Sequence, residues 1–417
     1  MTAESVAFRP TPRGERIELI DITRGAALFG VLLMNTVDVA GYTVPQSEFP
    51  GGASPILLDV FKFLVETRFL GLFSILFGLG FVLQIRRARE KGTAFRARYL
   101  RRVVILFFIG VIHSLVYPGD ILKTYATLGL LLPFVYRLSS KTLATLSLAC
   151  VLLSGLGPAL IQTVPSVSSH LAPNALSHFE LSSFCQKAHE PFATRAEAYA
   201  GGPFTQVMAL NACRIPGEYR GLIRGWGLTH IFGLFLIGVL IGMTDFVRQI
   251  PERLPQILKG TLVSGILGFA LLGIQIWIPN VGRGPLLAVA DITIGFGYYL
   301  TTVAYAGAIA LLYQTGFGRR ALRPLAALGR TALTIYLLQS VIYCTIFLGY
   351  GLGWDIRMGL PVILGITLLI YLGEVVACNV WLRYFRFGPA EWVWRSLTYL
   401  KVQPLLNRIE RERTSGP

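Results

Sequence analysis

Long stretches of uncharged, apolar residues recur along most of this chain, and they constrain its fold more than any other feature. A helix that crosses a lipid bilayer needs about 20 consecutive residues that are mostly apolar. Here 53% of the residues are hydrophobic and only 14% are charged, against roughly 25% charged residues in soluble domains. The mean hydropathy is correspondingly high, at +0.60. We therefore predict an all-α polytopic membrane protein.

The boundaries of the apolar stretches predict about ten transmembrane helices. The second stretch, 55–84, is too long for one untilted helix, so it either breaks near Glu66 or crosses the membrane with a strong tilt. No site typical of signal-peptide cleavage follows the polar N-terminal residues, so we expect the first stretch to remain as a helix. The predicted spans are 19–37, 55–84, 102–117, 121–137, 142–161, 221–244, 256–277, 286–313, 325–348 and 359–382.

Lysine and arginine residues predict the orientation, because loops rich in them stay in the cytoplasm. The loop 86–102 carries eight such residues, whereas the loop 38–54 has none. We therefore expect a cytoplasmic tail over 1–18, a transmembrane domain over 19–382 and a cytoplasmic C-terminal tail over 383–417. The net charge of +16 follows from this alternation of basic loops, and we predict no nucleic-acid partner.

One extracytoplasmic insertion, about 165–220, is long and holds two of the five cysteines, Cys185 and Cys213. These two residues form a disulfide if the compartment is oxidising and stay free thiols otherwise, and the sequence favours neither state. The spacing of the cysteines and histidines is not typical of a zinc site, so no metal is expected.

Charged residues inside the predicted spans are the candidates for function, because a charge in a bilayer costs several kcal/mol unless it is paired or lines a wet cavity. Asp21 and Arg24 are three residues apart on the first helix, so they share a face and can pair. Asn35 follows Arg24 by eleven residues, which is close to three helical turns and places it near the same face. These side chains form either a salt bridge and a packing asparagine or one wall of a polar tunnel.

A second candidate is the stretch 110–131, GVIHSLVYPGDILKTYATLGLL. His113 lies near the outer end of the third predicted span, and Asp120 begins the fourth after a tight turn. An imidazole titrates near neutral pH and suits general-base catalysis, and a carboxylate close by would orient it. The alternatives are an interhelical hydrogen bond for His113 and a helix cap for Asp120.

Arginines near the cytoplasmic ends of the spans are candidates for binding phosphate groups. Arg101 and Arg102 adjoin the third predicted span. Arg24 is equally suitable, because a planar guanidinium matches phosphate oxygens better than an ammonium group does. Arg68, beside the expected break in the second stretch, is a further candidate.

Five segments, taken in order along residues 16–400, resemble the YeiB-type family of bacterial inner-membrane proteins. The segments are ELIDITRGAALFGVLLMN, FLGLFSILFGLGF, GVIHSLVYPGDILKTYATLGLL, LGRTALTIYLLQS and FGPAEWVWRSLTY. This resemblance implies a multi-pass protein of the bacterial inner (plasma) membrane.

The first segment is also similar to transmembrane acyltransferases, which include the bacterial acyltransferase-3 proteins and heparan-α-glucosaminide N-acetyltransferase. Their first helix commonly carries an Asp-x-x-Arg-Gly-x-Ala pattern, matched here by Asp21, Arg24, Gly25 and Ala27. The resemblance implies transfer of an acyl group, with acetyl as the expected one, from cytoplasmic acyl-coenzyme A (acetyl-CoA) to an extracytoplasmic or membrane-bound small molecule or glycan. Acyltransferase-3 proteins have a histidine at the position of Asn35, so this chain would have to supply that histidine elsewhere.

On this hypothesis a continuous polar tunnel joins the cytoplasmic side to His113, which acts as a base or transient acyl carrier oriented by Asp120. Asn35 holds the thioester carbonyl or the acceptor. The residues facing the coenzyme A phosphates are Arg24, Arg68, Arg101 and Arg102. A small-molecule transporter or permease that uses the same charges is the alternative, and an accessory membrane protein without chemistry is a third possibility.

Overall fold

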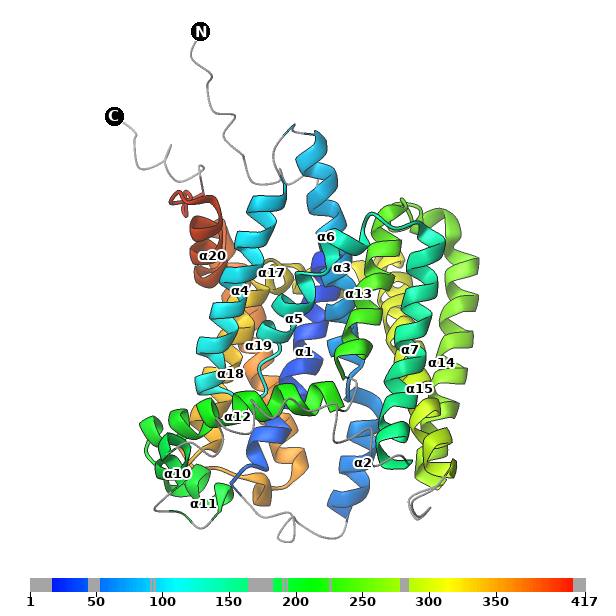
Figure 1. Cartoon of the computed structure of the whole chain (residues 1–417). Helices are drawn as coiled ribbons and strands as arrows, with labels where there is room; N and C mark the ends of the chain where they lie inside the picture. Colours follow the sequence, from blue (N-terminus) through cyan, green and yellow to red (C-terminus); the bar gives the residue numbers. More distant parts are fainter. Residues whose placement is uncertain are drawn as a thin grey trace, which may run out of the picture.

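The computed structural model describes residues 17–43, 53–90, 92, 95–163, 183–189, 192, 194–224, 227–277 and 285–407. In these ranges the chain is almost entirely helical, and most helices lie side by side in a bundle (Figure 1). The helices are α1 (Glu18–Ala40), α2 (Ala53–Val65), α3 (Arg68–Glu90), α4 (Arg96–Val116), α5 (Leu122–Gly129), α6 (Leu132–Val135), α7 (Ser140–Thr163), α10 (Ser183–His189), α11 (Arg195–Gly201), α12 (Phe204–Arg224), α13 (Gly227–Met243), η3 (Ile250–Arg253), α14 (Leu254–Trp277), α15 (Pro285–Gln314), α16 (Gly316–Leu322), α17 (Leu325–Arg330), α18 (Ala332–Phe347), η4 (Ile356–Met358), α19 (Leu360–Tyr384) and α20 (Pro389–Tyr399). Three parts of the chain lie outside the described residues: most of the predicted N-terminal tail, part of the insertion predicted at 165–220, and residues 408–417.

Six helical segments in the described ranges are long and apolar enough to cross a membrane, or seven if the bent pair α12–α13 counts as one span. The six are Glu18–Ala40, Leu57–Glu90, Arg96–Val116, Ile250–Ile274, Ile292–Gln314 and Leu360–Tyr384. Leu122–Val135, Ser140–Leu156 and Ala332–Phe347 are shorter apolar helices. The prediction of a helical, multi-pass membrane protein is therefore confirmed.

The long second apolar stretch is interrupted by a break at Glu66 and Thr67. Thr67 has a φ of 63°, in the left-handed region, and α3 begins directly after it. The buried Arg68 side chain donates hydrogen bonds from Nη1 to the carbonyl oxygens of Lys62 and Glu66. The last carbonyl groups of a helix lack donors within the helix, so Arg68 stabilises the end of α2. Of the two alternatives left open by the sequence, the structure shows the break.

Two glycines allow α1 and α17 to pack closely. A Cβ atom added at Gly25 would overlap the carbonyl oxygen of Leu325, and one added at Gly329 would overlap the carbonyl oxygen of Asp21. Small residues at a helix crossing let the backbones approach in this way. The close packing places the side chains that neighbour these glycines, Arg24 and Arg330, on the wall of one cavity.

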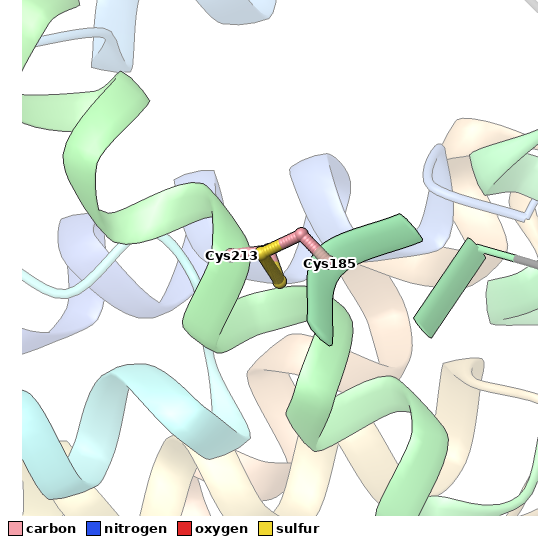
Figure 2. The surroundings of a disulfide bond; sticks show 2 residues. All are labelled: Cys185 and Cys213. Carbon is pink, nitrogen blue, oxygen red and sulfur yellow. A yellow bond between two sulfur atoms is a disulfide. The ribbon is translucent and has the colours of Figure 1, made fainter. Parts of the chain in front are cut away.

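Helices α10, α11 and α12 form a layer in the lower part of Figure 1, where α12 runs across the bundle and α10 and α11 lie at the lower left. α12 bends by 70° into α13, so the predicted sixth span 221–244 began too early. The sulfur atoms of Cys185 in α10 and Cys213 in α12 are bonded in a disulfide (Figure 2). Both cysteines pack with Ala198 and Leu210 in a small hydrophobic cluster. The sequence did not decide between thiols and a disulfide, and the structure has the disulfide.

Replacing Cys213 with serine is expected to destabilise this layer by about 3 kcal/mol, the usual effect of a disulfide that closes a loop of this size. The bonded cysteines are 28 residues apart in the sequence. Thermal unfolding of the purified protein, with and without reductant, measures the effect. Wild-type protein and a Cys150→Ser control, which changes a free cysteine, should lose stability in reductant, whereas Cys213→Ser should not respond. Equal responses of all three proteins would contradict the prediction.

Candidate functional site

A histidine and an aspartate pair inside the protein, where the end of α4 meets the start of α5. The Nδ1 atom of His113 lies 2.7 Å from Oδ1 of Asp120. Both side chains are buried, with exposed fractions of 6% for His113 and 5% for Asp120. A carboxylate on Nδ1 fixes the orientation of the ring and leaves the other nitrogen, Nε2, available as an acceptor. Nε2 is buried and has no hydrogen-bond partner in the described part of the chain.

Asp120 also caps the helix that follows it. Its Oδ2 atom accepts a hydrogen bond of 3.0 Å from the backbone N–H of Lys123. Helix caps satisfy N–H groups that have no partner within the helix. The two interpretations of Asp120 from the sequence, a partner for His113 and a helix cap, therefore apply to different oxygens of one carboxylate.

Lys123 connects the histidine–aspartate pair to the layer of α12. Its Nζ atom lies 3.8 Å from Oδ2 of Asp120 and 3.0 Å from Oε2 of Glu218 in α12. Lys123 is 1% exposed, and such a buried ammonium group is stable only when it is paired. Glu218 was not among the residues selected from the sequence, because it lies in a segment expected to be an external insertion.

Tyr336 of α18 lies on the other side of the pair. The centroid of its ring is 5.0 Å from that of His113. Its hydroxyl group is 3.5 Å from Oδ1 of Asp120 and accepts a hydrogen bond of 3.3 Å from the backbone N–H of Ile121. The phenol thus covers the buried pair on the side that faces the main cavity.

That cavity has a volume of about 410 Å³, within the range of roughly 300–1,000 Å³ typical of small-molecule sites. Seven arginines line it, but only two acidic residues, Asp21 and Glu391. Its inner end is formed by Ile121, Tyr125 and Tyr336, and aromatic and aliphatic side chains make up much of the remaining wall. The arginines are Arg24, Arg87, Arg98, Arg102, Arg330, Arg386 and Arg395. A cavity with this excess of guanidinium groups suits a ligand that is polyanionic at one end and apolar at the other.

Two of the four predicted phosphate-binding arginines line the cavity. Arg24 does so while its Nη1 atom pairs with Oδ1 of Asp21 at 3.1 Å. Arg102 does so with its guanidinium 3.8 Å from the centre of the Trp394 ring. Asp21 and Arg24 of the first helix and Arg102, beside the third predicted span, thus line the same cavity.

The other predicted residues lie outside this cavity. Arg68 is engaged in the helix break described above, and Arg101 and Asn35 are not part of the lining. His113 and Asp120 do not line it either, whereas Tyr336, which contacts both, does. The cavity lined by Arg24 therefore does not extend to His113 among the described residues.

Several cavity residues were missed because they come from the C-terminal third of the chain. Arg330 and Glu391 occur within the quoted segments LGRTALTIYLLQS and FGPAEWVWRSLTY, which were used only for the family resemblance. Trp394 Nε1 donates a hydrogen bond to the carbonyl oxygen of Arg102, which fastens α20 to α4. The available signal was a basic, aromatic helix following the last apolar stretch.

Glu391 caps α18 from the neighbouring helix α20. Its Oε1 atom accepts hydrogen bonds of 2.6 Å and 3.2 Å from the N–H groups of Leu333 and Thr334, and its Oε2 atom accepts one from the Thr334 hydroxyl. Burial raises the pKa of the Glu391 carboxyl, and these donors oppose part of that rise. The carboxylate thus holds the start of α18, and with it Tyr336, in place beside the cavity.

Replacing Glu391 with alanine is expected to lower the free energy of unfolding by about 2–3 kcal/mol, because two N–H groups of α18 lose their partner inside the protein. Glu391→Gln should cost less, since the amide oxygen still accepts a hydrogen bond. Thermal unfolding of the purified protein measures both. The exposed Glu252 provides the control, and its replacement by alanine should change stability by less than about 0.5 kcal/mol. Equal stability of the two alanine variants would contradict the capping role.

The fold and the site define a helical, multi-pass membrane protein with an arginine-lined cavity beside a buried histidine–aspartate pair. The family model described as "Protein of unknown function (DUF418)" matches residues 241–401. YxaH of Bacillus subtilis (strain 168), described as uncharacterized, is 29% identical over 97% of this chain and 99% of its own length. YeiB of Escherichia coli (strain K12), also described as uncharacterized, is 28% identical over 95% of this chain and 100% of its own. The chain is thus similar over nearly its whole length to YxaH and YeiB, in agreement with the resemblance of its five segments to the YeiB-type family. No match to a solved structure was found.

Proposed function

We propose that this protein is a membrane-embedded acyltransferase that moves an acyl group, typically acetyl, from cytoplasmic acyl-coenzyme A to an extracytoplasmic or membrane-bound acceptor. One observation carries the proposal. A cavity with seven arginines in its wall ends against the tyrosine that covers the paired His113 and Asp120. The Asp-x-x-Arg-Gly-x-Ala pattern shared with transmembrane acyltransferases agrees with this assignment, since its Asp21 and Arg24 lie on the cavity wall.

The lining of the cavity fits the two chemical halves of coenzyme A. Arginines such as Arg24 and Arg102 would bind the phosphate groups through charge-assisted hydrogen bonds. The apolar wall formed by residues such as Phe73 and Phe77 would accept the less polar arm that carries the thioester. An arm directed inward brings the acyl group toward Tyr336 and His113.

The transfer needs a base and a proton donor, and His113 can serve as both. With Nδ1–H donated to Asp120, Nε2 takes a proton from the hydroxyl or amine of the acceptor. The acceptor atom attacks the thioester carbonyl carbon, and the carbon–sulfur bond breaks. The departing thiolate recovers the proton from His113, so that the products are the acylated acceptor and free coenzyme A.

The proposed orientation places both termini in the cytoplasm and the chain in the bacterial inner membrane. We propose ten spans, which adds the bent pair and the three shorter apolar helices to the six long helices. The C-terminal end of α3, the N-terminal end of α4 and helix α20 lie at the upper end of the bundle in Figure 1, and Arg87, Arg98 and Arg395 of these helices line the cavity. This agrees with a cytoplasmic location for that end, because basic loops stay inside.

A transporter for a small metabolite is the second candidate, and the linked residues Asp120, Lys123 and Glu218 are the observation that favours it. Buried ionisable groups of this kind mark proton and substrate pathways in transporters. Such a protein would move its substrate in proteoliposomes without cleaving a thioester.

Binding and turnover of acetyl-coenzyme A by the purified protein test the proposal. We expect saturable binding of coenzyme A in lipid nanodiscs, and release of free coenzyme A that depends on an acceptor supplied from a panel of sugars and amines. Uptake by proteoliposomes is measured in parallel. Absence of coenzyme A binding would overturn the acyltransferase assignment, and gradient-driven uptake without thioester cleavage would replace it with the transporter.

A further inference from the structure

We propose that the side chain of Tyr336 is a gate between the arginine-lined cavity and His113, which must swing aside before a ligand in the cavity can reach the imidazole. The proposal rests on the proposed acyltransferase function for its catalytic consequence. The barrier itself is a property of the fold and can be measured without any substrate.

The position of Tyr336 makes it the barrier. It lines the inner end of the cavity, and its ring centroid lies 5.0 Å from that of His113. His113 is close to the cavity but is not part of its wall. The unpartnered Nε2 atom of His113 is unusual for a buried polar group, since such groups are nearly always hydrogen-bonded. An imidazole kept without a partner beside a side chain that lines the cavity is what a closed gate requires.

The hydroxyl of Tyr336 is held more loosely than those of three other buried tyrosines. It donates to Asp120 Oδ1 at 3.5 Å, against the usual distance of about 2.7–2.8 Å for an O–H donor. It accepts from the Ile121 N–H at 3.3 Å, against the usual distance of about 2.9–3.0 Å for an N–H donor. The Tyr125 hydroxyl lies 2.7 Å from Ser74 Oγ, the Tyr99 hydroxyl 2.8 Å from a carbonyl oxygen, and the Tyr343 hydroxyl 2.7 Å from Ser340 Oγ. Tyr336 therefore loses little hydrogen-bond energy when it leaves its position.

The surroundings of Tyr336 also provide space for movement. One side of its ring borders the cavity of about 410 Å³, so rotation about its side-chain bonds on that side does not require helices to separate. Its backbone is fixed, because the start of α18 is capped by Glu391. A mobile side chain on a fixed helix opens and closes a passage without unfolding the site.

A closed gate would keep a bound thioester away from His113 until the acceptor arrives. Active sites that exclude water prevent the hydrolysis of reactive groups in this way. Removal of the gate should therefore increase cleavage of the thioester by water relative to transfer to the acceptor.

Diethyl pyrocarbonate tests the gate directly, because it modifies unprotonated imidazole nitrogens and its product on each histidine is counted by mass spectrometry. In the full-length protein in nanodiscs, Tyr336→Ala is expected to speed modification of His113 by between about 10-fold and 1,000-fold, since minor conformations are typically populated at about 0.1–10%. Tyr336→Phe, which keeps the ring and loses its long contacts, should increase the rate by less than about five-fold, the factor that corresponds to one ordinary hydrogen bond. Tyr336→Trp should leave His113 protected.

His230 and Tyr371 supply the controls. His230 packs against Tyr299, outside the arginine-lined cavity, and its modification rate should not change in any variant. Tyr371 lies in α19, and its hydroxyl donates a hydrogen bond to the carbonyl oxygen of Gly25. Tyr371→Ala removes the same kind of ring as Tyr336→Ala does, and it should leave the rate of His113 modification unchanged. The gate proposal would be overturned if diethyl pyrocarbonate modified His113 at the same rate in the wild type, in Tyr336→Ala and in Tyr336→Phe.

The ratio of acetyl-coenzyme A hydrolysis to transfer separates this proposal from the proposed function. A protein that shows the expected modification rates but binds no coenzyme A has the gate and is not the acyltransferase. A protein that transfers acetyl groups with an unchanged ratio in Tyr336→Ala is the acyltransferase without the gate. Both proposals are supported if Tyr336→Ala still binds acetyl-coenzyme A and hydrolyses its thioester at a higher ratio to transfer than the wild type does.

Discussion

Replacing His113 with alanine is expected to lower the rate of acetyl transfer by about 10²–10⁴-fold, the usual contribution of a general base. Binding of coenzyme A should stay within about two-fold of the wild-type affinity, because His113 does not line the cavity in which the phosphate groups would lie. Single-turnover release of coenzyme A and equilibrium binding, measured on the same preparation, separate the two effects.

Two further variants sharpen this test. Asp120→Asn should reduce the rate by a smaller factor, since the amide no longer favours the tautomer with a proton on Nδ1 of His113. His230→Ala removes a histidine that packs against Tyr299 and should transfer at the wild-type rate. Turnover by His113→Ala at the wild-type rate would exclude this histidine as the base.

Replacing Arg24 with alanine should weaken coenzyme A binding by about 10–100-fold, the range expected for loss of a charge-assisted hydrogen bond. Arg24→Lys should recover only part of the affinity, since an ammonium group does not form the paired hydrogen bonds of a guanidinium. Isothermal titration with coenzyme A at low and high salt measures the effect, and the wild-type affinity should fall as salt increases.

Arg319 provides the matched control for Arg24. It lies in α16, outside the cavity, where it stacks on Tyr313. Arg319→Ala should bind coenzyme A with wild-type affinity. If both alanine variants bound it equally well, Arg24 would have no part in recognising the phosphate groups, whatever the transfer rate.

The helical architecture was largely predictable because the bilayer imposes a simple composition on the segments that cross it. The first predicted span, 19–37, corresponds to α1 at Glu18–Ala40, and the last, 359–382, to α19 at Leu360–Tyr384. α12 was not predicted, because it carries polar residues such as Asn211 and Glu218 and lies across the bundle. Apolar length identifies helices that cross a membrane and misses a helix that covers the end of a bundle.

The site was predictable only where its parts are close in sequence. His113 and Asp120 are separated by a short turn, so their proximity follows from the chain itself. Tyr336 and Glu218 reach the same place from distant segments, and no local pattern distinguishes them from the other residues of their helices. The cavity likewise combines arginines of the first helix with those of α17 and α20, which depends on packing that composition does not encode.

The position of α20 has a consequence for biosynthesis. This helix is the last one among the described residues, yet its Glu391 secures the start of α18 and its Arg395 lines the cavity. A chain that ends before α20 lacks both the carboxylate that caps α18 and part of the basic wall of the cavity. The cavity is therefore complete only when the last of the described helices has been added.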